Sequence, residues 1–538
     1  MNIPLTPIRF LRYPEQQYPR RTAVVCGSER FTYSQFAGRV SHLAGALRQA
    51  GLKPGQRVAY LSMNCHRLLE GYYGVPEAGG VFLPLNIRLS PQDLAFILND
   101  ASAKVLFLQK DFLGMVDCFR QKVPTVQSFI LLDGPPEASW LSPHNYEEFL
   151  ASAEPYRADI MEFDENSLAE LFYTSGTSAN PKGVMLTHRN VYLHALSVCI
   201  AFHTEAQSVE LHTIPLFHAN GWGVAHSLTL QGGTHVMIQR FDPKEVFRLI
   251  ERERATACSL VPTMATALVN SPELRKFDLS SLKRIVIGGA ASSPTIVREV
   301  EEKLGCMCFS GYGLTETSPM LSISPMKLGL HWDGDQRYAG QAMTGFPPPG
   351  MELRVVDGDD VNVPRDGKSI GEIIARSDGV MKGYWRQPED TANILRGGWF
   401  HTGDMATWNE DGYLLIVDRK KDIIVSGGEN ISSLEIEKAL IAHPCVYEVA
   451  VIPIPDPKWG ELPLALVVRK PNEKVSEQEL VEFCRSHLSH YKCPRSIEFV
   501  DSLPKTGTGK ILKKELRRKY WQGQETIRPE FTAGQKES

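Results

Sequence analysis

Short apolar runs alternate with amphipathic stretches along most of this chain, and no other feature constrains its fold as much. Val58–Ser62 is a strand-like run, and the stretch that follows it, Cys65–Ala78, is helix-like. Ser293-Pro294 predicts another helix start, with proline in the first turn. Further strand-like runs are Val105–Leu108, Phe129–Leu132 and Leu282–Gly288. The alternation predicts an α/β fold, with layers of helices on largely parallel sheets.

The pattern changes from about residue 345. Met351–Val356 and Gly371–Ala375 are strand-like runs separated by a turn region rich in Asp, Gly and Pro, which predicts a β-rich subdomain. We place a boundary at residues 418–422. Beyond it, the predicted helices are Ser433–Ile441 and Ser476–His490, the second opened by a Ser-x-x-Glu capping box, and the predicted strands are Val446–Ile454 and Leu464–Arg469. We expect a large N-terminal domain of residues 1–417, a hinge at 418–422 and a small α+β domain of residues 423–538.

Composition and charge exclude several classes of function. The 538-residue chain has a formal net charge of −4, which gives no general basic field for nucleic acid. Its ten cysteines form no C-x-x-C pair, and Cys306-Met-Cys308 is too close for ordinary zinc spacing and fits alternation along a strand. We expect free thiols in a reducing cytoplasm. We expect no signal peptide, and no apolar run approaches the roughly 18 residues of a transmembrane helix. The sequence leaves the oligomeric state open, a homodimer included.

One loop has the composition of a phosphate-binding segment. Residues Tyr173–Lys182 read Y-T-S-G-T-S-A-N-P-K, with small or hydroxylated residues from Thr174 to Ala179. Such a loop can bring backbone N–H groups and hydroxyls close to phosphate oxygens, with Lys182 adding one positive charge. It is not a Walker A loop, because its lysine does not stand between Gly and Ser or Thr. Taken alone, the segment could equally be a Gly/Ser-rich surface loop.

Four further motifs follow this loop in order. They are Tyr312-Gly-Leu-Thr-Glu-Thr317, Trp399-Phe-His-Thr-Gly-Asp404, Asp418-Arg-Lys-Lys-Asp422 and Pro504-Lys-Thr-Gly-Thr-Gly-Lys510. Together the five motifs resemble the core motifs of the adenylate-forming enzymes, the superfamily of acyl-CoA synthetases, peptide-synthetase adenylation domains and firefly luciferase. The resemblance runs from about Pro14 to about Arg518. One departure is Ala179, where the family usually has Gly or Ser, so the loop has less flexibility there.

The resemblance implies a site for ATP and Mg²⁺. Glu316 is the candidate Mg²⁺ ligand, since this ion prefers one or two carboxylates with phosphate oxygens. Thr315 would contact the phosphate and Tyr312 would stack on adenine. Asp404 would accept hydrogen bonds from the ribose hydroxyls, with Arg419 as its partner. The other residues that the resemblance places around the nucleotide are Thr174, Ser175, Gly176, Thr177, Ser178, Lys182, Gly289, Ala290, Gly311 and Gly313. Without the resemblance, Tyr312 would be interpreted as a core aromatic and Glu316 as a surface charge.

Lys510 lies in a Gly/Thr-rich turn, and a flexible lysine suits charge that builds up during adenylation. The resemblance identifies it as the catalytic lysine of the first half-reaction. It places Lys421 at a hinge about which the small C-terminal domain moves, a motion that would replace Lys510 at the site by Ser426-Gly427-Gly428. The two glycines permit the close backbone approach that a narrow pantetheine tunnel requires.

Residues Pro215–Trp222 read P-L-F-H-A-N-G-W. His218 resembles the family histidine beside the acyl pocket and the thiol tunnel, and a buried structural histidine is the alternative. The ending Asn-Gly-Trp is similar to that of short- and medium-chain acyl-activating enzymes, including the methylmercaptopropionate ligases. The indole of Trp222 would shorten the pocket, and the small residues Gly288 and Gly289 would leave room along the other wall.

These residues predict an ATP-dependent acyl-CoA synthetase. A short- or medium-chain fatty acid would react with ATP to give acyl-adenylate and pyrophosphate, and coenzyme A would then displace AMP. Three alternatives stay open. An aryl-CoA ligase of the benzoate or cinnamate type shares every core motif, and a stand-alone adenylation enzyme would load a carrier protein instead of CoA. A non-catalytic nucleotide-binding protein is disfavoured by Lys510, Glu316 and Asp404, because binding alone does not require a mobile lysine.

Overall fold

The computed structural model describes residues 2–136, 138–142, 144–174, 180–420, 422–426, 429–471, 473–505 and 511–521. Two units divide the chain. The first comprises Met1–Leu353 and Ala375–Phe400, and the second comprises Arg354–Ile374 and His401–Ser538. The boundary predicted at residues 418–422 lies inside the second unit, so the predicted domain division, which concerns motion, stays a prediction. In the described part of the chain, no helix has both the length and the apolar character that crossing a bilayer requires.

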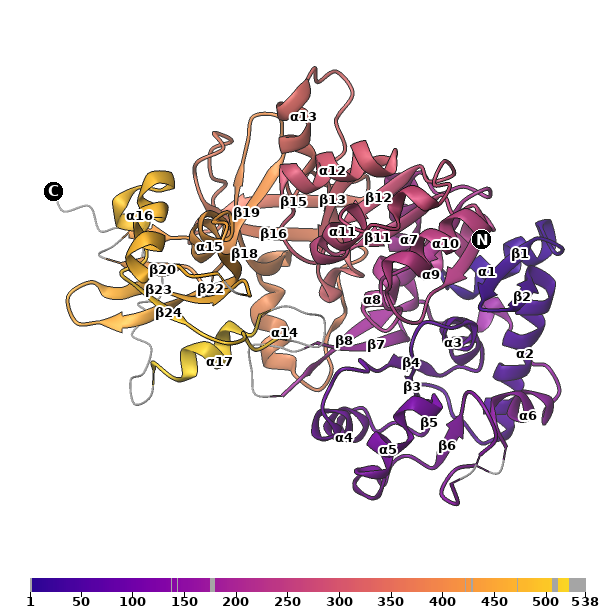
Figure 1. Cartoon of the computed structure of the whole chain (residues 1–538). Helices are drawn as coiled ribbons and strands as arrows, with labels where there is room; N and C mark the ends of the chain where they lie inside the picture. Colours follow the sequence, from indigo (N-terminus) through magenta and orange to yellow (C-terminus); the bar gives the residue numbers. More distant parts are fainter. Residues whose placement is uncertain are drawn as a thin grey trace. The chain divides into compact units, whose positions relative to one another are not determined.

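An eight-stranded sheet in the first unit confirms the predicted α/β class (Figure 1). Its order is β14 (Met320–Ile323), β13 (Met307–Gly313), β12 (Arg284–Ile287), β11 (Ala257–Leu260), β9 (Val209–His212), β10 (Thr234–Met237), β1 (Thr22–Cys26) and β2 (Glu29–Thr32). The strands from β13 to β1 are parallel, and only the two edge strands pair antiparallel. Helices α10 (Pro243–Glu253), α11 (Pro262–Val269) and α12 (Pro294–Leu304) share one apolar core with this sheet.

A seven-stranded sheet forms the other half of the first unit. Its order is β17 (Gly383–Tyr384), β8 (Lys182–Thr187), β7 (Leu168–Thr174), β4 (Val81–Pro84), β3 (Arg57–Leu61), β5 (Val105–Leu108) and β6 (Ser128–Leu131). Helices α4 (Pro91–Asp100) and α5 (Leu113–Asp117) pack on one core with it. The remaining helices of the unit are α1 (Ile8–Gln17), α2 (Tyr33–Gln49), α3 (His66–Glu77), α6 (Tyr146–Ala151), α7 (His188–Phe202), α8 (Ala219–Trp222), α9 (Val224–Gln231), α13 (Gly334–Gln341) and α14 (Pro388–Ile394).

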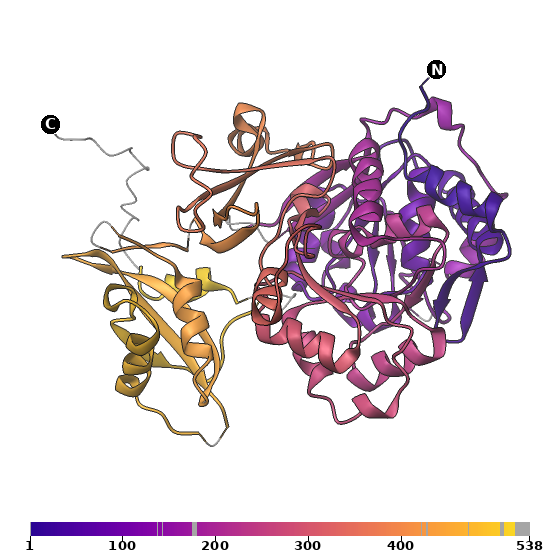
Figure 2. The ribbon, with the colours of Figure 1, turned by 90° about the horizontal axis from the view of Figure 1, so that it is seen from above.

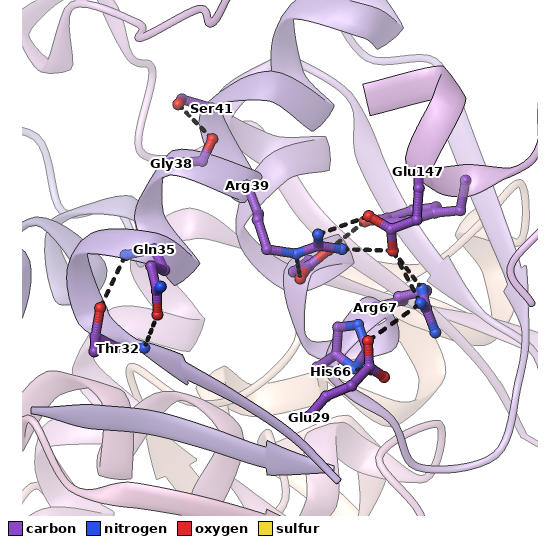
Figure 3. A network of polar contacts seen from close by, with 11 residues as sticks. Glu29, Thr32, Gln35, Gly38, Arg39, Ser41, His66, Arg67 and Glu147 are labelled. Carbon is purple, nitrogen blue, oxygen red and sulfur yellow. Dashed lines mark hydrogen bonds and ion pairs between the residues drawn. The ribbon is translucent and has the colours of Figure 1, made fainter. Parts of the chain in front are cut away.

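A polar network joins α2, α3 and α6. Glu70 is fully buried, accepts a hydrogen bond from Arg39 Nε at 2.6 Å and another from the Tyr146 hydroxyl at 2.7 Å. Burial raises the pKa of Glu70, while Arg39 opposes that rise. Figure 3 shows Arg39 and Arg67 converging on Glu147, at 2.7 and 2.9 Å. Because each buried charge has a partner, the network fixes the three helices to one another.

Two smaller sheets belong mainly to the second unit. The first contains β15 (Met351–Val356), β16 (Gly371–Ser377), β18 (Phe400–Trp408) and β19 (Leu414–Arg419), which confirms the predicted β-rich segment. The second contains β21 (Glu429–Ile431), β20 (Ile424–Ser426), β23 (Gly460–Arg469), β22 (Val446–Asp456) and β24 (Ser496–Phe499). Helices α15 (Ser433–Ile441) and α16 (Glu477–His487) share a core with one face of the latter sheet, and Figure 2 shows helices against its strands. Helix α17 (Lys513–Arg518) packs on the other face through Leu516.

Several predicted elements are confirmed at their ends. Ser293 caps α12 by accepting from the Ile296 N–H, and proline stands in the first turn. Ser476 and Glu479 form the predicted capping box of α16. The predicted helix Ser476–His490 is too long, because Leu488 is extended (φ −129°, ψ 154°) and the residues after it form a separate 3₁₀ turn. Met307 is 52% exposed between two buried cysteines, as alternation along a strand predicts.

Candidate active site

Three parallel strands of the eight-stranded sheet lead directly into segments that the sequence singled out. Strand β9 continues into Thr213–His218, β12 into Gly288–Ala291, and β13 into the 3₁₀ turn Thr315–Thr317. The carboxyl ends of parallel strands lie at the same edge of a sheet, and ligands of α/β proteins bind outside that edge. The fold therefore gathers the predicted acyl-pocket and nucleotide segments at one place in the first unit.

Trp222 lies against the backbone of Gly288 and Gly289. A Cβ atom at Gly288 would stand 3.1 Å from two carbons of the indole and 2.8 Å from the carbonyl oxygen of Gly311. A Cβ atom at Gly289 would stand 3.5 Å from the indole. Only glycine fits under the ring at Gly288, so the Trp222 indole packs directly on this glycine pair. That the ring bounds an acyl pocket stays a prediction.

Asn64, which follows strand β3 of the seven-stranded sheet, fixes the segment His212–Leu216 that precedes Trp222. Asn64 donates to the carbonyl oxygens of His212 and Ile214 at 2.8 and 3.0 Å, and its own oxygen accepts from the Leu216 N–H at 2.7 Å. His218, half-buried, follows this clamped segment. Sequence reasoning missed Asn64, because its contacts lie about 150 residues away along the chain.

Gly313 allows the turn that presents Thr315 and Glu316. A Cβ atom at Gly313 would stand 1.7 Å from the carbonyl oxygen of Pro319, so no other residue fits there. The same oxygen accepts from the Leu314 N–H at 3.0 Å. Thr315 is 8% exposed, and the half-buried Glu316 follows it. The turn thus presents the Glu316 carboxylate from a backbone that its close contact with Pro319 holds in place.

Tyr384 connects Glu316 with Lys182. The Tyr384 hydroxyl donates to Oε1 of Glu316 at 2.9 Å, and Nζ of Lys182 lies 5.0 Å from the centre of the same ring. Nζ of Lys182 also pairs with Asp390 at 2.5 Å. Burial, and then the charge of Glu316, raises the pKa of Tyr384, so its hydroxyl keeps the proton that it donates. Sequence reasoning missed Tyr384, which the pairing of β17 with β8 brings here from 68 residues beyond Glu316.

The β7–β8 hairpin carries the predicted phosphate loop. Thr174 and Lys182 are register partners at its end. Lys182 is thereby fixed beside the loop, with its side chain 14% exposed. Ser175, Gly176, Thr177, Ser178 and Ala179 lie outside the described residues, and their role stays a prediction.

In the second unit, Asp404 and Arg419 are register partners on β18 and β19. Oδ1 of Asp404 lies 3.2 Å from Nε of Arg419, with the aspartate side chain 5% exposed and the arginine side chain 48% exposed. A carboxylate oriented by a guanidinium is suited to accept two hydroxyl hydrogen bonds. The structure thus brings together the two residues that the sequence assigned to ribose.

The predicted hinge is anchored on both flanks within the second unit. Oδ2 of Asp418 accepts from the backbone N–H and the hydroxyl of Ser433 at 2.6 and 2.7 Å. Oδ1 of Asp422 pairs with Arg517 at 2.9 Å. Ser426 ends β20. The other predicted residues of this region, Lys421, Gly427, Gly428 and Lys510, lie outside the described residues.

A cavity of about 450 Å³ opens beside the clamped segment of the first unit. Its apolar lining includes Pro215, Phe217, Ile238, Phe241 and Met264, and its polar lining includes Arg88, Gln239 and Arg240. A volume of this size lies in the range of small-molecule sites. Apolar walls and guanidinium groups fit an extended molecule that has an apolar stem and an anionic end. Asp111 also lines the cavity and pairs with Arg240 at 3.3 Å, so it offsets part of the charge of that arginine.

No group of three or more His, Cys, Asp or Glu side chains could hold a metal among the residues that the structure describes. Glu316 together with phosphate oxygens and water would supply the donor set that Mg²⁺ prefers. The chemistry of this single carboxylate fits Mg²⁺ bound together with a nucleotide.

Comparison with known proteins finds the same family along nearly the whole chain. The family described as AMP-binding enzyme matches residues 11–385, and the AMP-binding enzyme C-terminal domain matches residues 435–510. The 4-hydroxybutyrate–CoA ligase 2 of Metallosphaera sedula is 36% identical over 522 residues, which cover 95% of this chain and 94% of that protein. The long-chain-fatty-acid–CoA ligase of Thermus thermophilus is 38% identical over 497 residues, 91% and 90% of the two chains. The crystal structure of ATP-bound MatB from Rhodopseudomonas palustris superposes with a TM-score of 0.83 at 30% identity, covering 96% of this chain and 99% of that one.

Proposed function

The chain belongs to the AMP-binding enzyme family, and we propose that this ATP-dependent acid–thiol ligase makes acyl-CoA from a short- or medium-chain carboxylic acid. The observation that carries the proposed substrate class is the position of Trp222. Its indole lies over Gly288 and Gly289, with a Cβ atom at Gly288 only 3.1 Å from the ring. A long acyl chain would have to displace this ring, whereas a short one fits before it.

In the first half-reaction, we assign the ATP phosphates to the turn at Thr315–Glu316 and to the end of the β7–β8 hairpin. Glu316 would hold Mg²⁺, which neutralises phosphate charge as the acid attacks. Tyr384 orients the Glu316 carboxylate, and Lys182 adds a positive charge next to the same ring. Lys510 would stabilise the charge that builds on the α-phosphate. Asp404 and Arg419 would hold the ribose.

In the second half-reaction, we assign the 450 Å³ cavity to coenzyme A. Its apolar walls suit the pantetheine stem, and Arg88 and Arg240 suit the phosphates. Phe217 lines the cavity next to His218, so a thiol at its inner end would be close to the acyl wall. We expect R88A/R240A to raise the KM for CoA at least about tenfold while pyrophosphate release in the absence of CoA stays unchanged. An unchanged KM for CoA would remove the cavity from this role.

Two alternatives share the residues of the first half-reaction. An aryl-CoA ligase would prefer flat aromatic acids, and an enzyme that loads a carrier protein would not form free acyl-CoA. The similarity to proteins named CoA ligases supports CoA as the acceptor. For the location of the enzyme, the ten free cysteines support a reducing compartment, and we propose the cytoplasm.

The test is pyrophosphate release with straight-chain acids from C2 to C16 and with aryl acids, with and without CoA. We expect the highest kcat/KM between about C3 and C8, acyl-CoA as the product, and loss of activity on chelation that added Mg²⁺ restores. Glu316→Gln should raise the Mg²⁺ concentration needed for half-maximal rate, while Glu352→Gln, an exposed carboxylate of the same unit, should not. A best substrate of C14 or longer, or an aryl acid, would overturn the proposed substrate class.

A further inference from the structure

The backbone that carries Trp222 has an unusual conformation. Five consecutive residues, Ala219 to Gly223, have positive φ angles of 44°, 45°, 62°, 61° and 84°. They form one left-handed turn, although three of them carry a side chain that disfavours this region. Backbone strain of this kind persists only where surrounding contacts enforce it, and it clusters at functional sites.

A single buried carboxylate enforces this turn. Glu170 lies on β7 and is 0% exposed. Its Oε2 accepts from Asn220 Nδ2 at 3.1 Å, and its Oε1 accepts from His226 Nε2 at 2.6 Å. Oδ1 of Asn220 accepts from the Gly223 N–H at 2.7 Å, which closes the turn on itself. Glu170 therefore holds both the centre of the turn and the helix that follows it, α9.

The position of Glu170 also connects the two parts of the site. Strand β7 ends at Thr174, where the predicted phosphate loop begins, four residues beyond Glu170. The turn that Glu170 holds includes Trp222, whose indole packs on Gly288. A displaced carboxylate would therefore release the wall without touching either substrate.

We propose that Glu170 is a positioning residue for acid selectivity, acting through Asn220 and the left-handed turn on the Trp222 indole. This inference rests on the proposed function, in which Trp222 limits the length of the acid. A merely structural Glu170 would lower stability and reduce kcat/KM for all acids in parallel, whereas a positioning residue changes the ratio between short and long acids.

The experiment compares kcat/KM for a C4 and a C10 acid in four variants. Asn220→Gly keeps a backbone that tolerates positive φ but removes both side-chain bonds, and Glu170→Ala removes the carboxylate. We expect both to lower the C4-to-C10 ratio by about tenfold, through KM for the acid, with KM for ATP unchanged. Glu170→Gln retains an acceptor for Asn220 and should restore most of the ratio. Glu70→Gln changes an equally buried carboxylate, which is bonded to Arg39 and Tyr146, and should leave the ratio as in the wild type.

A double-mutant cycle with Trp222→Gly tests whether Glu170 acts through the indole and distinguishes failure of this proposal from failure of the proposed function. If Glu170 acts through the indole, Asn220→Gly added to Trp222→Gly should change the ratio less than twofold. If Asn220→Gly still changes the ratio tenfold in the Trp222→Gly variant, Glu170 does not act through Trp222. If Asn220→Gly alone leaves the ratio unchanged, the proposal is wrong, and this test remains available even if Glu170→Ala fails to fold. Failure of the proposed function looks different, since the wild type would then release no pyrophosphate with either acid or would prefer the longer one.

Discussion

Trp222 has a φ angle of 61°, which makes glycine its conformationally matched truncation. We expect Trp222→Gly to raise kcat/KM for C8 to C12 acids and to lower it for C3 and C4 acids, because the cavity left by an indole admits several methylene groups. A contact with one methylene changes discrimination by roughly 1–3 kcal/mol. The measurement is kcat/KM for a C3 to C12 series beside the melting temperature. If activity falls by the same factor for every acid and the melting temperature falls with it, Trp222 packs in the core and does not line the pocket.

We expect two lysines outside the described residues, Lys510 and Lys421, to act in different half-reactions. Lys510→Ala should abolish pyrophosphate release from acid and ATP but spare CoA transfer from preformed acyl-adenylate. Lys421→Pro should do the reverse, because proline fixes φ near about −65° and stiffens the predicted hinge. Single-turnover assays of each step measure both effects. An equal loss of the two steps in Lys510→Ala would contradict the division of labour, and unchanged overall turnover in Lys421→Pro would exclude the hinge role.

At this scale, sequence motifs paired Asp404 with Arg419, and the structure brings these two residues into contact. The motifs placed Gly288 along the wall opposite Trp222, whereas in the structure it lies directly under the indole. They did not predict Tyr384 or Glu170. Both act by hydrogen bonds to residues 68 and 50 positions away, and no local pattern encodes such a distance. These contacts depend on which strands become neighbours in the sheet, and that is settled only by the tertiary fold.

Among the elements, α3 approaches its sheet more closely than an alanine would allow. A Cβ atom at Gly71 would stand 2.5 Å from the Phe82 ring and 2.9 Å from the Tyr60 ring, both fully buried. Gly71→Ala should therefore destabilise the protein by about 1–3 kcal/mol through overpacking. This effect outweighs the gain of roughly 1 kcal/mol in helix propensity.

Gly38 on α2 is the matched control, since a Cβ atom there meets nothing within 4 Å. Gly38→Ala should stabilise the protein by about 0.5–1 kcal/mol. The urea midpoints of both variants, compared with that of the wild type, show whether each substitution raises or lowers stability. Stabilisation by Gly71→Ala would show that α3 can move away from the sheet without loss.

Helix ends were the best-predicted feature of the elements, because capping is local. Ser293 and Ser476 cap the helices that they predicted. The hairpin β7–β8 and the short strand β17 were not predicted as sheet members, and neither was the order of strands. Order depends on which apolar faces meet, and most runs in this chain are apolar enough to occupy several positions in a parallel sheet.

For the molecule as a whole, five buried histidines make stability depend on pH. Burial lowers the pKa of His66, His194 and His212 to about 3 and that of His188 to about 4, and it lowers the pKa of His235 further. Below their ordinary pKa of roughly 6.5, the unfolded chain binds protons that the folded chain does not. The stability that these histidines contribute is thus complete above about pH 6.5 and is lost progressively as the pH falls towards 4, because unfolding then takes up protons.

Urea midpoints at pH 7.5, 6.5, 5.5 and 5.0 measure this loss. His188→Gln should remove the contribution of one proton from the slope, because glutamine does not titrate. His144→Gln should not change the slope, since the His144 side chain is 58% exposed. A wild-type stability that is flat between pH 6.5 and 5.0 would contradict the neutral, buried state of these rings.

The division into units shows where sequence reasoning at this scale reached its limit. The change in sequence pattern predicted a β-rich segment after residue 345, and the structure contains the four-stranded sheet β15-β16-β18-β19 there. Compactness, however, assigns Arg354–Ile374 to the second unit and returns Ala375–Phe400 to the first. A chain that leaves a unit and re-enters it has no signature in local composition.

Strand β1 has a consequence for the synthesis of the protein. It pairs with β10, Val24 opposite His235, so about 210 residues separate the first strand from its parallel partner. At roughly 5–20 residues per second, a ribosome needs on the order of 10–40 s to make that partner. Until then, β2 is the only one of the two native partners of β1 that has been made, so Val24 and Val25, which are 0% and 1% exposed in the finished protein, lack the cover of β10. The nascent chain therefore presents an apolar hairpin for chaperones to bind until β10 leaves the exit tunnel.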